Sequence, residues 1–105
     1  MLDAAREVED FVRDRSRRSL DEDRLLVRGV TKSIEIIGEA ASQVSAGLRA
    51  AHPQVPWRDA ADMRNRLVHG YFDIDLDVVW STVTEDVPEL IRLLEQLLES
   101  EGGSD

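Results

Sequence analysis

The stretch "SLDEDRLLVRGVTKSIEIIGEAASQVSAGL", from Ser19 to Leu48, decides the fold predicted for this chain. Its apolar residues recur every three or four positions, which is the spacing of one buried face of an α-helix. They are Leu26, Val30, Ile34, Ile37, Ala41, Val44 and Leu48. Ser19 followed by Glu22 has the spacing of a capping box, so the helix should begin there. No proline interrupts the pattern, and we expect one long helix that reaches about Leu48.

Helical patterns also lie on either side of this stretch. Residues 2–12 space their apolar side chains as an amphipathic helix does and lead to an Arg-rich turn. After the long helix, "AHPQVPW" holds Pro53 and Pro56, which indicates a loop followed by a proline in the first turn of a helix. A third helix should therefore run from about Pro56 to Val68, with Gly70 as its C-terminal glycine.

The last helix should follow "DIDLD", with Asp75 or Asp77 as its N-cap. Its apolar face holds Val79, Trp80, Val83, Val87, Leu90, Leu94 and Leu97. Pro88 lies inside this pattern and should kink or restart the helix. The polar end "ESEGGSD" predicts one helical domain over residues 1–99 and a disordered acidic tail over 100–105. Four helices with short connections predict an all-α, up-and-down four-helix bundle.

The formal net charge of −9 is unevenly distributed along the chain. Residues 1–71 hold 12 acidic and 12 basic residues, whereas residues 72–105 hold 10 acidic residues and only Arg92. The first part is therefore neutral, and ten of its 12 basic residues form three clusters. They are Arg13, Arg15, Arg17 and Arg18; Arg24, Arg28 and Lys32, one stripe of the long helix; and Arg58, Arg64 and Arg66. A single cluster of this kind is more often a solvated helix face than a site, but the asymmetry permits a polyanion on one face.

Several classes of site lack the residues that they need. The chain has no cysteine, which excludes disulfides and thiolate metal sites and favours a cytoplasmic location. Its two histidines have no HExxH spacing, so we expect no zinc site. Asp73 begins a run like a calcium loop, but Val78 and Thr84 stand where that loop needs Gly and Glu. There is no glycine-rich phosphate loop and no run of about 20 apolar residues, so neither a cofactor nor a membrane partner is expected.

The segment "DMRNRLVHGYFDID", residues 62–75, concentrates polar groups that a packed helix does not need. Asn65 and His69, four apart, would share one face of a helix, and the helix dipole would favour protonated His69 in the last turn. Arg64 and His69, five apart, would be separated by about 140° around the helix. A two-fold dimer pairing this helix with its copy would place two Arg and two His in one cleft.

Such a cleft has the groups for RNA cleavage without a metal. A histidine can move the proton of a 2′-hydroxyl or of the leaving oxygen, and an arginine can stabilise the charge on the reacting phosphate. DNA lacks the 2′-hydroxyl and should not be cut. The same residues can also be purely structural, with His69 capping carbonyls, Arg64 in a surface ion pair and Tyr71 packed over the bundle end. The spacing by itself leaves both interpretations open.

The order Arg64, four residues, His69, one residue, Tyr71 matches the R-x4-H-x-Y motif of the HEPN superfamily. The surrounding sequences "IEIIGEAA", "VPWRDAADMRN" and "DIDLDVVW" resemble those of HepT-like toxins from HepT/MntA toxin–antitoxin systems. The resemblance covers nearly the whole chain.

This resemblance implies a homodimeric, metal-independent endoribonuclease, the toxin of a type VII toxin–antitoxin system. Arg64 and His69 would be catalytic in a cleft between protomers, and Asn65 and Arg66 would support the site. An MntA-like nucleotidyltransferase antitoxin would silence the toxin by transferring AMP from ATP to Tyr71. The added phosphate would fill the cleft and neutralise its positive charge.

A role of a different class is also compatible with the motif. A non-catalytic HEPN dimerisation and binding module would use the same residues to dock a nucleotidyltransferase partner or a nucleotide. It would bind its partner without cutting RNA.

Overall fold

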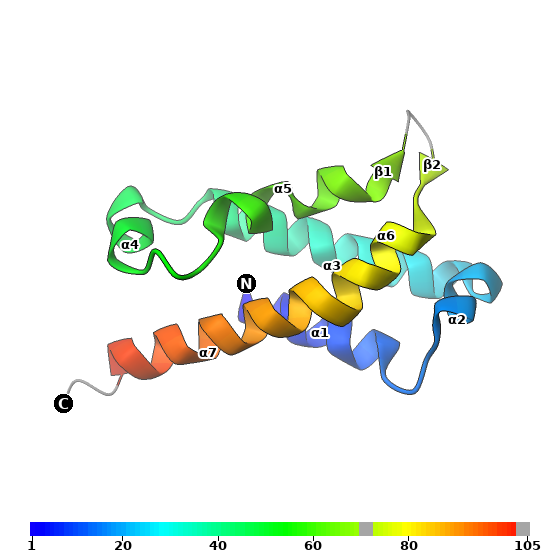
Figure 1. Cartoon of the computed structure of the whole chain (residues 1–105), viewed down its shortest axis with the longest axis horizontal. Helices are drawn as coiled ribbons and strands as arrows, with labels where there is room; N and C mark the ends of the chain where they lie inside the picture. The colour runs from blue at the N-terminus through cyan, green and yellow to red at the C-terminus, as the bar shows by residue number, and fades with distance from the viewer. Residues whose placement is uncertain (70–72, 103–105) are drawn as a thin grey trace.

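The computed structural model describes residues 1–69 and 73–102, apart from the side chains of His69 and Glu101. The long helical segments run alternately in opposite directions (Figure 1). They are α1 (Leu2–Val12), α3 (Arg24–Ser42), α5 (Trp57–Leu67) and a last segment made of α6 (Leu76–Ser81), the π-helical η1 (Thr82–Asp86) and α7 (Val87–Gly102). The predicted all-α, up-and-down four-helix bundle is confirmed.

The core forms where α3 packs against α1 and α5, and where α7 packs against α1. The periodic face of α3 is buried as predicted, with Val30, Ile34 and Ile37 fully inaccessible to solvent. Burying each such side chain contributes about 1.5–3 kcal/mol relative to leaving it exposed. The apolar positions of the last helix are also buried, except for the half-buried Trp80.

The single helix expected over residues 19–48 is wrong, because the chain forms α2 (Arg17–Glu22), α3 and α4 (Ala46–Ala51) in its place. Asp23 adopts an extended conformation (φ −128°, ψ 99°), and its carboxylate accepts a hydrogen bond from the N–H of Leu26. Ser45 caps α4 in the same way, accepting from the N–H of Leu48. Short polar side chains thus compete with the backbone for helical hydrogen bonds and divide a continuous apolar pattern.

The expected capping box is displaced by one turn. It joins Ser16 and Ser19 at the start of α2, rather than Ser19 and Glu22. The serine that was expected to begin a helix therefore lies inside one.

The last helix begins and restarts as predicted. Asp75 is its N-cap and accepts from the N–H groups of Asp77 and Val78. Pro88 has no N–H to donate, and just before it the N–H of Val87 donates to the carbonyl of Thr82, five residues back. Helix α7 continues to Gly102, beyond the expected boundary at residue 99, and residues 103–105 lie outside the described part.

A glycine allows α5 to lie close to α3. A Cβ atom at Gly38 would come within 3.0 Å of the backbone oxygen of Ala61 and 3.4 Å of that of Ala60. Any side chain here would push the two helices apart, and with them the side chains that meet between them. Over the described ranges, no helix is long and apolar enough to cross a membrane.

Candidate active site

Helix α5 carries the first half of the motif on its outer face. Its inner face buries Trp57, Ala60, Met63 and Leu67, spaced three or four residues apart. The Trp57 indole also donates to the carbonyl oxygen of His52 at 3.0 Å, which anchors the start of the helix. Residues 64–66, between the last two buried positions, are consequently exposed.

The second half of the motif is not helical. Helix α5 ends at Leu67, and Val68 is already extended (φ −94°, ψ 124°). Strand β1 (Val68–His69) pairs antiparallel with β2 (Asp73–Ile74), so that His69 lies opposite Asp73. The placement of His69 in the last helical turn is therefore wrong, and so are the alignment of Asn65 with His69 and the helix-dipole argument that depended on it. Gly70, Tyr71 and the side chain of His69 lie outside the described part of the structure.

Arg64 reaches across to α3. Its Nε donates to Oε1 of Glu35 at 3.1 Å, and Nζ of Lys32 lies 3.9 Å from the other oxygen, Oε2. The Arg64 and Glu35 side chains are 48% and 37% exposed, so solvent screens the pair. Glu35 binds Nε, and the two terminal nitrogens of Arg64 make no hydrogen bond within the described part of the structure, so they can still donate to an anion.

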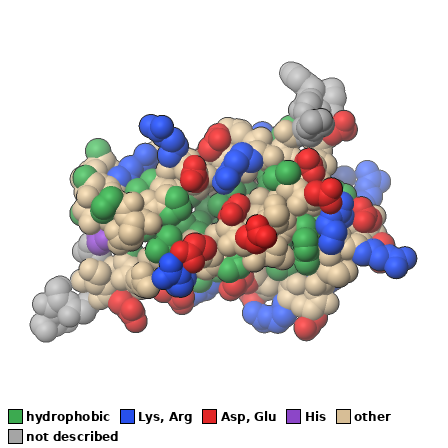
Figure 2. Space-filling view, in the orientation of Figure 1, with side chains coloured by type: hydrophobic (Ala, Val, Ile, Leu, Met, Phe, Trp, Pro, Cys, Tyr) green, Lys and Arg blue, Asp and Glu red, His purple; other side chains and the backbone are tan. Residues whose placement is uncertain are grey.

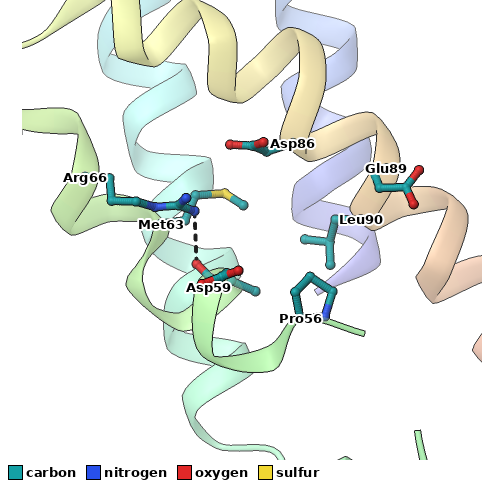
Figure 3. A pocket seen from close by; sticks show the side chains of 8 residues that line it. Pro56, Asp59, Met63, Arg66, Asp86, Glu89 and Leu90 are labelled. Carbon is teal, nitrogen blue, oxygen red and sulfur yellow. Dashed lines mark hydrogen bonds between the residues drawn. The ribbon is translucent and has the colours of Figure 1, made fainter. Parts of the chain in front are cut away.

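The two residues expected to support the site point elsewhere. The amide of Asn65 donates to the carboxylate of Asp62 at 2.8 Å, within the same helix. Arg66 donates through Nη2 to the backbone oxygen of Asp59 at 3.2 Å, as Figure 3 shows. Within the described part, neither residue shares an acceptor with Arg64.

Arg66 borders a pocket of about 120 Å³ between α5 and the junction of η1 with α7. Its apolar floor includes Met63 and Leu90, and Asp86 and Glu89 stand on the opposite wall (Figure 3). The carboxylate of Glu89 is already engaged, because Arg92 donates to both of its oxygens and thereby lowers the pKa of Glu89 below its ordinary value. The pocket is small and belongs to the α7 side of α5, away from Glu35.

Charges of both signs are mixed on the face drawn in Figure 2, around exposed hydrophobic side chains. No single-sign surface is evident in this view. Among residues 1–69 and 73–102, no group of His, Asp and Glu side chains is arranged to hold a metal ion.

Glu35 was missed as a partner of Arg64, since 29 residues separate the two in sequence. A signal was present. Glu35 stands between the apolar residues Ile34 and Ile36, and it is one of only two acidic residues in α3. An acid beside a buried helix face needs a cationic partner or solvent, and α5 supplies the cation.

The chain matches the family described as Ribonuclease HepT-like over residues 1–97. It belongs to this family. The HepT-like match spans α1 to most of α7, and so includes both Glu35 and the motif.

Three relatives of this HepT-like chain show how far the similarity extends. Probable ribonuclease HepT of Thermococcus cleftensis is 38% identical over 90 residues, covering 86% of this chain and 82% of the relative. A protein of Caldanaerobacter subterraneus subsp. tengcongensis, provisionally named an RNase, is 36% identical over 89% of this chain and 75% of its own length. A Methanocaldococcus jannaschii protein with the same provisional name is 30% identical over 100% of this chain and 87% of its own. No solved structure matches the chain.

Proposed function

We propose that this protein is a metal-independent endoribonuclease, the toxin of a type VII toxin–antitoxin system, with Arg64 and His69 as its catalytic residues. The observation that carries the proposal is the contact of Arg64 with Glu35, which engages Nε of a half-exposed side chain and leaves the terminal nitrogens without a hydrogen-bond partner among the described residues. Glu35 thus positions an arginine that can still donate hydrogen bonds to a phosphate, and the chain belongs to a ribonuclease family.

The reaction uses the 2′-hydroxyl of the RNA as nucleophile. Its oxygen attacks the adjacent phosphorus while the bond from phosphorus to the 5′-oxygen breaks, giving a 2′,3′-cyclic phosphate and a 5′-hydroxyl. His69 carries the proton that leaves the 2′-oxygen or the one that reaches the 5′-oxygen. Arg64 stabilises the negative charge that builds up on the phosphate oxygens between these two events.

A second copy of the chain completes the site in this proposal. One protomer offers one Arg64 and one His69, whereas a two-fold pairing beside α5 brings two of each into one cleft. Ile36, which follows Glu35 on α3, and Ile74 on β2, which pairs with Val68, are 41% and 38% accessible. They offer an apolar contact to a partner copy.

Control of the toxin is assigned to Tyr71. An MntA-like nucleotidyltransferase antitoxin transfers AMP from ATP to its hydroxyl and releases pyrophosphate. Tyr71 falls in the chain between His69 and Asp73, the two residues paired in the β1–β2 ladder. A phosphate attached there competes with RNA for Arg64.

The test measures RNA cleavage in EDTA by protein made alone and by protein made with the neighbouring antitoxin gene, together with intact mass. We expect the protein made alone to cut RNA, and Arg64→Ala and His69→Ala to be inactive but folded. Co-expression should add the mass of AMP at Tyr71 and abolish cutting, and Tyr71→Phe should escape both effects. A folded wild-type dimer that neither cuts RNA nor gains mass overturns the proposal.

One observation favours the second candidate, a non-catalytic binding module. The carboxylate of Glu35 offsets the charge of Arg64, as expected for a structural ion pair. This version predicts that His69→Ala keeps partner binding and that the wild type has no RNase activity to lose. The cleavage assay separates the two candidates directly.

A further inference from the structure

The three basic clusters of the sequence differ in how the folded chain uses them. In the first cluster every arginine is paired with a carboxylate. The pairs are Arg13 with Asp10, Arg15 with Asp23, Arg17 with Asp21 and Asp77, and Arg18 with Glu22. The hydrogen bond from Arg17 to Asp77 even raises the pKa of Arg17. This cluster is neutralised inside the protein and has little charge left for a partner.

The stripe on α3 is different. Arg24 and Arg28 are exposed and make no ion pair with any residue in 1–69 or 73–102. Lys32, 72% exposed, has one distant partner at 3.9 Å, and that partner, Glu35, is already bonded to Arg64 at 3.1 Å. Four cations thus lie along this side of α3 and α5 with one carboxylate among them.

The stripe leads to the motif. Helices α3 and α5 pack against each other in opposite directions, so the N-terminal half of α3 lies at the end of the bundle that carries β1 and β2 (Figure 1). The contact between Glu35 and Arg64 joins the two helices, and Lys32, Arg28 and Arg24 follow from it toward that end. Charges four residues apart on a helix are spaced about 6 Å along its axis, close to the separation of successive phosphates in an extended strand.

We propose that Arg24, Arg28 and Lys32 form a track that binds the phosphate backbone of single-stranded RNA and guides it to Arg64. The inference rests on the proposed function, because an RNA substrate provides the polyanion that this stripe fits. The track reads charge rather than sequence, since flexible cations that contact phosphates carry no base information. Binding releases counterions, so affinity should fall steeply with salt.

The experiment compares two triple variants with the same change in net charge. Arg24→Gln/Arg28→Gln/Lys32→Gln removes the track. Arg6→Gln/Arg13→Gln/Arg18→Gln removes three exposed arginines that are each paired with an acid, to Glu95, Asp10 and Glu22. All six residues are exposed; five of them lie in helices and Arg13 directly follows α1. Glutamine is nearly as good a helix former as arginine or lysine.

Cleavage of a single-stranded RNA is measured from low to moderate salt, and binding of a fluorescent single-stranded RNA is measured in the His69→Ala background. The track variant should raise both KM and the dissociation constant Kd about tenfold or more at low salt, because binding is weaker. Its kcat should stay within about twofold of the wild-type value. Its slope of log Kd against log salt should be shallower by about 2, at about 0.7 per lost phosphate contact. The control variant should match the parent.

Each other outcome is decisive. Equal KM and equal salt slopes for the two variants overturn the track. A track variant that changes the oligomeric state in gel filtration but not the salt slope overturns it too, and makes this face an interface between copies. If the wild type binds RNA through the track but does not cut it, the track stands and the proposed function fails. If it cuts RNA with no contribution from the track, the function stands and the track fails.

Discussion

Arg64 and Arg66 stand two residues apart on the exposed face of α5, yet they make contacts on opposite sides of the helix. Arg64 donates to the carboxylate of Glu35 on α3. Arg66 turns toward α7 and donates to the backbone oxygen of Asp59 in its own helix. A carboxylate from another element fixes both the position and the charge environment of a guanidinium, whereas a carbonyl of the same helix leaves it on the surface. The two arginines therefore differ in the group that accepts their hydrogen bond, although the residue type is the same.

The largest expected effect is the difference in RNA cleavage rate between a variant that lacks Arg64 and a variant that lacks Arg66. Arg64→Ala should lower the rate of RNA cleavage by about 100-fold or more, the usual effect of deleting a donor that stabilises transition-state charge. Arg66→Ala should lower it by about threefold at most. Initial rates in EDTA, with circular dichroism as a check on folding, decide this. Equal losses from both variants would contradict the distinction.

The close contact of α3 with α5 is tested at Gly38. Gly38→Ala would place Cβ 3.0 Å from the Ala61 oxygen, and should reduce the free energy of unfolding by about 1–3 kcal/mol through overpacking. Gly47→Ala is the matched control, since nothing lies within 4 Å of its Cβ, and it should be neutral or stabilising by about 1 kcal/mol. Urea titrations of both variants measure the change. The close-approach argument would be abandoned if the two variants were equally stable.

Glu35 offers a more selective way to disturb the α3 side. Glu35→Gln keeps an oxygen acceptor but loses the charge that strengthens the hydrogen bond from Arg64, so kcat should fall about tenfold while KM changes little. Glu39→Gln, one turn along α3, is the control and should behave as the wild type. A change in KM alone would show that Glu35 affects RNA binding and not the orientation of Arg64.

The smallest expected effect lies on the α7 side, where Arg92 occupies both oxygens of Glu89. The hydrogen bonds from Arg92 lower the pKa of Glu89 from its ordinary value of 4.5. Their contribution to stability is therefore present above pH 4.5 and is lost as the pH falls through the lowered pKa. Arg92→Gln should reduce Tm slightly at pH 7 and not at all at the acid end of a pH series. A difference that persists at low pH would rule out this linkage.

The sequence predicted the bundle well because the bundle depends on periodicity. The apolar residues at the periodic positions of α3 and of the last helix face the core where their spacing placed them, apart from the half-buried Trp80. The prediction of one helix over residues 19–48 failed because single polar side chains interrupt the helix. Asp23 and Ser45 cap new helices inside a continuous apolar pattern.

The candidate site was predictable only in part. The sequence placed Arg64 in a helix, as the structure does, but the end of that helix depends on the pairing of Val68 with Ile74 and of His69 with Asp73, which no local spacing encodes. The contact with Glu35 depends on how closely Gly38 lets α5 approach α3, and so appears only once two distant segments are packed.

The π-helical segment η1 has a consequence for how this gene tolerates change. A π-helical turn holds an extra residue relative to an α-helical one. Deleting one codon between Thr82 and Asp86 would let this segment become a regular α-helix, and later residues would keep nearly their present direction relative to α6, because the wide turn already absorbs one extra residue. The seam of Leu90, Leu94 and Leu97 would then stay in the core. The same deletion at the start of α7, before Leu90, would instead turn the seam by about 100°. In-frame single-codon deletions should therefore be tolerated better in these five codons than in the first turn of α7.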